Sequence, residues 1–245
     1  MNIIVCIAKV PDTTTKIVFS PDGRQLATPN IQWVINPLDE FALTRALEIK
    51  EAKSGKVIIV SVGKADCDPL IRKAFAMGAD EGIRVDAEPA DPYFTSVQLA
   101  HYIRTVPFDM IFMGRETSDF AGAQVPGMVA ELLGLPFISG VPKFDFDGTL
   151  ATMEREIEGG KETVKVKPPF VVSAQEGITE PRIPTMRGIM TARTKPLKVV
   201  PAVTGEILTE ASNYELPPQK GECKMVDAET PEKLIELLHT EAKII

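Results

Sequence analysis

A glycine-containing loop with residue types suited to phosphate binding runs from Gly114 to Gln124. It reads Gly-Arg-Glu-Thr-Ser-Asp-Phe-Ala-Gly-Ala-Gln and leads into a segment that we expect to be a helix. Small residues let backbone N–H groups approach a phosphate, and the start of a helix favours an anion. The loop has neither the G-x-G-x-x-G dinucleotide motif nor a Walker sequence, so an ordinary tight loop is an equally good interpretation of this segment alone.

A second segment, at about residues 176–193, has the composition of a protein contact surface. Two basic residues, Arg182 and Arg187, flank a largely apolar tip at residues 183–186, and a helix-compatible run follows at residues 187–193. An apolar tip in a polar rim suits docking to another protein, because Met is adaptable and common at variable contact surfaces. A plain strand–loop–helix connection is the generic alternative.

Side chains for nucleophilic, acid–base or metal chemistry are sparse. The three cysteines form no Cys-x-x-Cys pair and there are only two histidines, which fits a reducing compartment rather than a disulfide scaffold or a zinc site. Glu154, Glu156 and Glu158 alternate along an expected strand with no histidine nearby in sequence, so a solvated strand face is the simpler interpretation and a hydrolase has no support. We therefore predict a protein that is not itself an enzyme.

Net charge and the sequence pattern argue against further classes of protein, and the length limits the number of domains. The chain has 27 basic and 34 acidic residues, and 27 − 34 = −7 argues against a general nucleic-acid binder, which needs a basic face. We see no signal or transit peptide and no membrane-spanning stretch, which predicts a bacterial cytoplasmic protein without direct membrane insertion. The 245 residues suffice for one large domain or two small ones.

Three buried strands are expected to position the loop that could bind phosphate. Continuous apolar runs near residues 3–8, 56–63 and 109–114 are typical of strands covered on both faces, usually in parallel sheets. They end at Cys6, Val62 and Gly114. Ligands of open α/β sheets bind beyond the carboxyl ends of strands at the topological switch point, so the sequence predicts a mononucleotide site there.

Helix signals alternate with these strands. Asn36 is a candidate N-cap and Pro37 suits the first helical position, with the helix ending near Gly55. Further helices are expected at residues 66–77, 95–105 and 122–133. This alternation predicts an α/β fold with a doubly wound, mostly parallel sheet and helices on both faces.

The last hundred residues depart from this alternation. Residues 138–168 predict an antiparallel meander at the sheet edge, and the chain then returns to the parallel sheet near Phe170. After residue 200 the apolar pattern is sparse and irregular, with one short amphipathic helix expected at 231–240. We therefore predict an α/β nucleotide-binding domain at 1–199 and an extended C-terminal arm at 200–245.

Several motifs together resemble those of the electron-transfer flavoprotein β subunit. The sequence around Glu180-Pro-Arg182 and Pro184-Thr-Met-Arg-Gly-Ile-Met190 closely resembles the signature of that family. The opening strand and three further motifs are also similar and occur in the right order: Asn2 to Asp12, Ile35-Asn-Pro-Leu-Asp-Glu40, Ala74-Phe-Ala-Met-Gly-Ala-Asp80 and Glu154 to Gly160. The resemblance covers residues 1 to about 200.

The resemblance implies an AMP in this subunit that is not consumed and an FAD held mainly by a larger subunit. Gly114, Arg115, Asp119, Gln124 and Val125 agree with the loop of the family, whereas the middle of the loop departs from it. The matching cofactor-binding positions are Cys6, Asn36, Pro37, Leu38, Asp39, Val62, Gly114, Arg115, Glu116, Thr117, Ser118, Asp119, Gly122, Gln124, Val125, Pro126 and Gly127.

The resemblance also implies partners. The chain would form a heterodimer with the larger α subunit, on which the arm packs. Acyl-CoA-type dehydrogenases would dock at loop 182–190, with Met186 at the position of an apolar anchor that is normally leucine, and a membrane quinone reductase would accept the electrons. The matching docking residues are Arg182, Ile183, Met186, Arg187 and Ile189, with Glu156 pairing an arginine of the α subunit near the flavin.

Two alternatives remain open from the sequence. Some members of the family hold a second FAD in place of AMP and split electron pairs between two acceptors. An ATP-binding or ATP-using module could also be built on the same architecture, since fold alone does not determine function.

Overall fold

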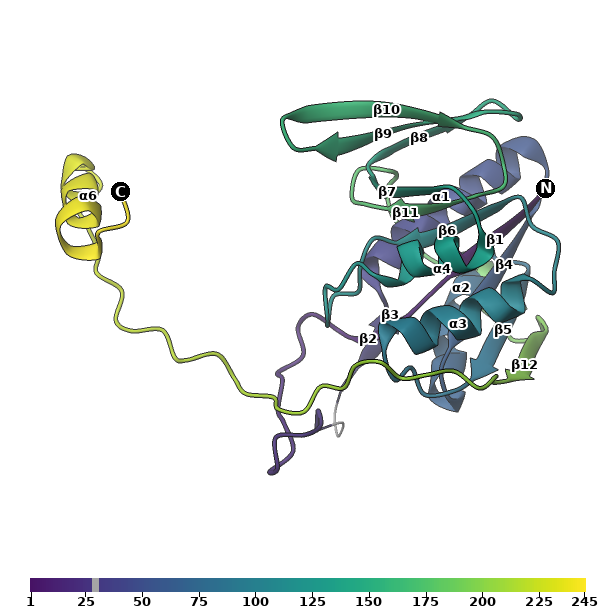
Figure 1. The fold of residues 1–245 in the computed structure, drawn as a ribbon, viewed down its shortest axis with the longest axis horizontal. Helices are drawn as coiled ribbons and strands as arrows, with labels where there is room; N and C mark the ends of the chain where they lie inside the picture. The colour runs from purple at the N-terminus through teal and green to yellow at the C-terminus, as the bar shows by residue number, and fades with distance from the viewer. Residues whose placement is uncertain (28–30) are drawn as a thin grey trace.

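The computed structural model describes residues 1–27 and 31–245 (Figure 1). Within this part of the chain, seven parallel strands form one sheet in the order β12-β5-β4-β1-β6-β11-β7. The strands are β1 (Asn2–Cys6), β4 (Lys56–Val62), β5 (Glu81–Asp86), β6 (Met110–Gly114), β7 (Phe137–Val141), β11 (Phe170–Ala174) and β12 (Leu197–Pro201). The predicted parallel sheet is confirmed.

Helices cover both faces of this sheet, as predicted for a doubly wound fold. Helices α1 (Pro37–Lys53) and α2 (Asp68–Met77) belong to one buried apolar cluster, with Leu43 and Phe75 among its members. Helices α3 (Pro92–Ile103) and α4 (Val125–Leu133) belong to a second cluster that includes Leu99 and Val129. Pro37 begins α1 and Gly78 ends α2 with a φ of 132°, a conformation that glycine adopts readily.

The switch point of the sheet lies between β1 and β6. From β1 the chain builds outward through β4 to β5, and it then crosses to the other side of β1 to form β6, β7 and β11. The loops that follow β1 and β6 therefore separate at the carboxyl edge of neighbouring strands. This is the place where open α/β sheets bind ligands.

The predicted antiparallel excursion is also present. Within residues 31–245, strands β8 (Lys143–Phe146), β9 (Ala151–Ile157) and β10 (Gly160–Val166) form a separate three-stranded sheet. Strand β7, which begins the excursion, belongs to the parallel sheet and forms its edge. Strands β2 (Lys9–Pro11) and β3 (Trp33–Ile35) pair as a small ribbon, and a bridge between Phe19 and Leu26 closes a short hairpin that contains Gly23.

Strand β12 was not predicted. It adds to β5 at the opposite edge of the sheet after the short helix α5 (Met186–Ala192), which agrees with the helix expected at 187–193. Its last residue, Pro201, is acceptable there because an edge strand has one side without ladder bonds.

The beginning of the C-terminal arm is held on the domain. The Gln98 side chain donates to the carbonyl of Val203 and accepts from its N–H, both at 2.8 Å. Asp91 accepts from the N–H groups of Leu208 at 2.7 Å and Thr209 at 2.9 Å. Tyr214 then stacks on Phe19 with ring centroids 5.3 Å apart.

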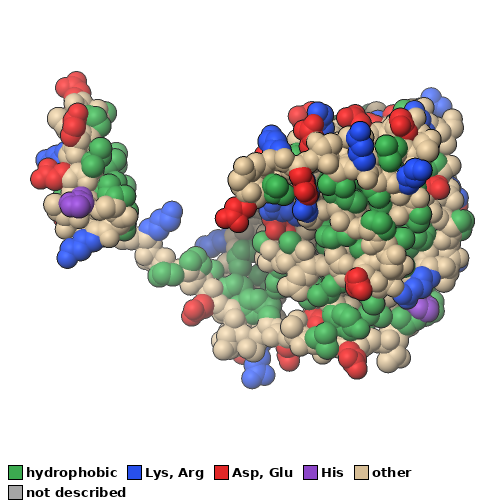
Figure 2. Space-filling model, turned by 45° about the horizontal axis from the view of Figure 1, so that its top comes forward, with side chains coloured by type: hydrophobic (Ala, Val, Ile, Leu, Met, Phe, Trp, Pro, Cys, Tyr) green, Lys and Arg blue, Asp and Glu red, His purple; other side chains and the backbone are tan. Residues whose placement is uncertain are grey.

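Beyond Tyr214 the arm leaves the domain. It continues to helix α6 (Glu232–Leu237) and a π-helical turn (Leu238–Ala242), which stand apart from the rest of the molecule (Figures 1 and 2). Apolar side chains along it are largely exposed, with Met225 at 85% and Leu216 at 60%. The predicted short helix is confirmed.

Candidate nucleotide site and docking segment

Asp39 joins the two strand ends that border the switch point. It lies in the first turn of α1 and is buried. Its Oδ2 accepts from the N–H of Ala8, just after β1, at 2.8 Å, and its Oδ1 accepts from the N–H of Gly114, at the end of β6, at 2.7 Å. The carboxyl group therefore fixes the spacing of the strand ends from which both loops begin.

Burial dominates the electrostatics of this carboxyl group. It raises the pKa of Asp39 to about 7, against the effect of the two N–H donors, Ala8 and Gly114, which favour the ionised form. Burial also raises the pKa of the neighbouring Cys6 thiol, and the negative charge of Asp39 raises it further. Cys6 is therefore an uncharged packing residue beneath the site and not a nucleophile.

Asn36 is the N-cap residue of α1, as predicted, but its side chain makes no capping hydrogen bond within this helix. Its Nδ2 donates to the carbonyl of Glu116 at 2.9 Å, and its Oδ1 accepts from the N–H of Ser118 at 3.1 Å. The side chain is 1% exposed. Asn36 thus holds the start of the loop that follows β6 against the start of α1.

The rest of the loop is exposed and has unusual backbone angles. Ala121 has a φ of 48° and Ala123 a φ of 51°, a left-handed region that L-residues enter at a cost. The N–H of Ala121 donates to the carbonyl of Thr117 at 2.8 Å, and Phe120 at the apex is 70% exposed. Such a conformation persists only where its surroundings fix it.

Helix α4 begins directly after this loop. Its N-cap is Gln124, and among the described residues no side-chain hydrogen bond caps this end of the helix. An uncapped helix start offers N–H groups and a partial positive charge to an anion. The small loop residues and this helix start together fit a phosphate-bearing ligand.

The predicted cofactor positions converge on this edge. Leu38 and Asp39 lie against Gly114, where a Cβ atom would meet Asp39 Oδ1 at 2.5 Å. Cys6 and Val62 are buried in one apolar cluster below, with Val125 packed against it. In the loop after β6, Arg115 forms an ion pair with Glu116 at 2.6 Å, and Pro126 in the first turn of α4 is buried. The other predicted positions form the loop and the start of α4: Thr117, Ser118, Asp119, Gly122, Gln124 and Gly127.

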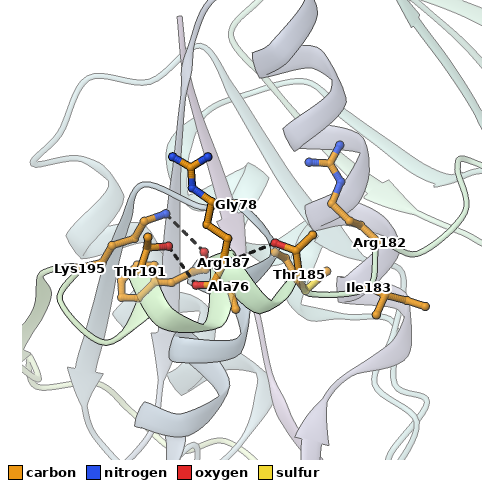
Figure 3. A pocket seen from close by; sticks show the side chains of 11 residues that line it. Ala76, Gly78, Arg182, Ile183, Thr185, Arg187, Thr191 and Lys195 are labelled. Carbon is orange, nitrogen blue, oxygen red and sulfur yellow. Dashed lines mark hydrogen bonds between the residues drawn. The ribbon is translucent and has the colours of Figure 1, made fainter.

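The docking segment, at about residues 176–193, lies away from the candidate nucleotide site and packs beside α2. Ile183 is 83% exposed and Met186 77%, and Ile189 and Met190 beside them are also exposed. An open cavity of about 300 Å³ lies between the segment and the end of α2, and Figure 3 shows the basic side chains of Arg182, Arg187 and Lys195 around it. The predicted apolar tip with a basic rim is therefore present on the surface.

Backbone carbonyls and two basic side chains fix the base of this segment. Arg72 of α2 donates to the carbonyls of Ala192 and Lys195, at 2.8 and 2.5 Å. Lys195 Nζ donates to the carbonyl of Ala79 at 2.5 Å, and burial lowers the pKa of Lys195. Gly188 lies so close to the carbonyl of Ala76 that no side chain fits between them. Sequence reasoning missed these roles, which no local pattern marks.

Two residues expected at the docking surface have other surroundings. The guanidinium of Arg182 is held by both carboxylate oxygens of Glu51 on α1, at 2.6 and 2.9 Å, which raises the pKa of Arg182. Glu156 lies on β9 in the antiparallel sheet, exposed and 3.8 Å from Lys161. Arg187 and the apolar side chains of Ile183, Met186, Ile189 and Met190 are exposed on the surface of this segment.

Two further features, a metal-ligand cluster and a membrane-spanning helix, are absent from the described residues. Within residues 1–27 and 31–245, no group of three or more His, Cys, Asp or Glu side chains is placed to hold a metal ion. No helix in those same ranges has the length and apolar character needed to cross a membrane.

Comparison with known proteins decides the family. The family model described as the electron transfer flavoprotein domain matches residues 24–204. The electron transfer flavoprotein subunit beta of Bacillus subtilis is 34% identical over the whole of both chains. The chain belongs to the electron transfer flavoprotein β-subunit family. The corresponding protein of Syntrophomonas wolfei is 36% identical, over 90% of this chain and 87% of its own.

A further relative of the electron transfer flavoprotein family has a different name. The acryloyl-CoA reductase electron transfer subunit gamma of Anaerotignum propionicum is 31% identical over 97% of both chains. All three relatives are named as subunits for electron transfer. The resemblance drawn from the motifs is therefore confirmed at the level of the family.

Proposed function

We propose that this chain is the small subunit of a heterodimeric electron-transfer flavoprotein. It carries electrons from acyl-CoA-type dehydrogenases, as in fatty acid oxidation, to a membrane quinone reductase. Family membership carries this proposal, and the exposed docking segment around Met186 supports it. Free cysteines, two buried and one exposed, fit a reducing compartment such as the cytoplasm.

We further propose a structural AMP at the carboxyl edge of β1 and β6. Loop 116–124 and the start of α4 would hold its phosphate, because they combine small residues with an uncapped helix start. The FAD, held mainly by the α subunit, supplies the acceptance and release of electrons when bound. The residues of this chain would cover one side of it, exclude water and present the assembly to its partners.

The test is to purify the chain together with its α subunit and to measure flavin and adenine nucleotide per heterodimer. One FAD and one AMP are expected. Two FAD and no AMP would assign the site to the second candidate below. ATP turnover by the pair would overturn the carrier function.

A bifurcating subunit with its own FAD is the second candidate. The relative named as an electron transfer subunit of acryloyl-CoA reductase is the observation behind it, because that name ties the subunit to one reductase.

Met186→Ala should strongly weaken reduction by a dehydrogenase. Met186 is 77% exposed at the tip of the docking segment, so its loss removes an anchor without disturbing a core. Truncating a hot-spot side chain that becomes buried against a partner costs at least ~2 kcal/mol of binding free energy, which is roughly a thirtyfold loss of affinity. The measurement is the rate of electron transfer from dehydrogenase against flavoprotein concentration.

Val18→Ala is the control for this prediction, because Val18 is an exposed apolar residue on the separate hairpin. Its half-saturation should equal that of the wild type. Flavin content and reduction by dithionite should be unchanged in both variants. If Met186→Ala keeps the wild-type half-saturation, the anchor lies elsewhere.

A further inference from the structure

We propose that Asn36 is a positioning residue that holds the nucleotide loop in its binding conformation. The inference rests on the proposed nucleotide site at this edge of the sheet. Its observation is that both polar ends of one buried side chain are bonded to the main chain of the loop, at Glu116 and Ser118.

Each end of the Asn36 carboxamide is bonded to the main chain of the loop. Its Nδ2 donates to Glu116, and its Oδ1 accepts from Ser118. Asn36 is 1% exposed, so these two bonds are shielded from water. Asn36 therefore acts on a nucleotide through the conformation of the loop.

The arrangement also explains why Asn36 does not cap α1. An Asn at an N-cap normally accepts from an N–H in the first turn of its own helix. Here the Asn36 side chain instead reaches 80 residues along the sequence to Glu116. The main chain of Asn36 still begins the helix, since its carbonyl accepts from Asp39 and Glu40.

The loop needs such a clamp because its own conformation is unfavourable. Ala121 and Ala123 both have a positive φ, and most of the residues from Ser118 to Gln124 are exposed. Asn36 fixes the start of the loop and α4 fixes its end, so the strained part is suspended between two fixed points. Without the clamp, the loop can relax to more favourable angles and the N–H groups lose their common direction.

Gln98 provides a matched control. It is also a carboxamide, 1% exposed, and it also makes two main-chain bonds, to Val203 at the base of the arm. Removing it should destabilise the chain to an extent similar to the removal of Asn36. Only Asn36 is bonded to the loop, so only its removal should affect the nucleotide.

The experiment is a calorimetric titration of AMP into the full-length chain, with amide hydrogen exchange of residues 116–124 in the absence of nucleotide. Asn36→Ala should weaken AMP binding about tenfold and speed exchange in the loop, since two hydrogen bonds to the loop are lost. Gln98→Ala should leave both unchanged. Asn36→Asp keeps the acceptor for Ser118 and should lose less affinity for adenosine, which has no phosphate to repel, than Asn36→Ala does.

Three outcomes would overturn the inference. Wild-type AMP affinity in Asn36→Ala would show that the clamp does not matter for binding. Equal losses in Asn36→Ala and Gln98→Ala would show general destabilisation. Unchanged loop exchange in Asn36→Ala would show that the loop holds itself. If the wild-type chain does not bind AMP, the proposed nucleotide fails, and the exchange measurement alone decides the role of Asn36.

Discussion

Gly114→Ala should destabilise the chain by about 3 kcal/mol and abolish nucleotide binding. A Cβ atom there would lie 2.5 Å from Asp39 Oδ1 and 2.9 Å from both Asp39 N and Leu38 C. Two of these atoms are backbone at the start of α1, which packs on the sheet and has no room to retreat. The strand end and the helix would separate, and the bond from Gly114 N–H to Asp39 would be lost with them.

Chemical denaturation and AMP titration measure these two effects. Gly160→Ala is the control, because a Cβ atom there meets nothing within 4 Å and Gly160 is not among the glycines with positive φ. It should unfold at the same denaturant concentration as the wild type. A Gly114→Ala chain as stable as the control would contradict the close approach of β6 and α1.

Ending the chain after Tyr214 should abolish formation of the heterodimer while leaving the domain folded. The removed residues carry exposed apolar side chains, including Met225 at 85% and Ile235 at 60%. Apolar surface of this kind gains by burial on a partner, about 25 cal/mol per Å². Gel filtration with the α subunit measures pairing, and circular dichroism measures the fold.

The position of the cut matters for this test. A cut at residue 199 would also remove the end of β12 and the main-chain groups that bond to Gln98 and to Oδ2 of Asp91. Asp91 would keep only the N–H of Phe94 at its Oδ1, so the cut would disturb the domain itself. A cut after Tyr214 keeps these bonds and isolates the effect on the partner. A truncated chain that pairs with the affinity of the full chain would refute the role of the arm.

The strands of the sheet that are buried on both faces were predictable, because such burial requires a continuous run of apolar residues in the sequence. Strands β1, β4 and β6 have almost entirely buried residues, and the helices between them have marked starts and ends, such as Pro37 and Gly78. Strand β12 was not predictable in this way. Lys198 and Val199 are exposed, so its pattern is weak, and its partner β5 lies more than 100 residues earlier, since Lys198 pairs with Ile83.

The place of the candidate site could be inferred from the strand ends, but the use of its side chains could not. Asn36 has the sequence context of an N-cap, and only the fold brings Glu116 and Ser118 within its reach. Asp39 looks like an ordinary acid in a first helical turn, while its partner Gly114 is 75 residues away. The same holds for Arg182, whose bond to Glu51 of α1 no local sequence pattern marks.

The hydrogen bonds that attach the arm to the domain determine which sequence changes in the arm would alter its course. Asp91 and Gln98 bind N–H and C=O groups at residues 203, 208 and 209, which every amino acid except proline supplies alike. The route of the arm is thus written in α3 and the residue before it. Substitutions of the side chains in this part of the arm should therefore leave its course unchanged. A proline at any of the three positions, or an added residue between 203 and 208, would change it.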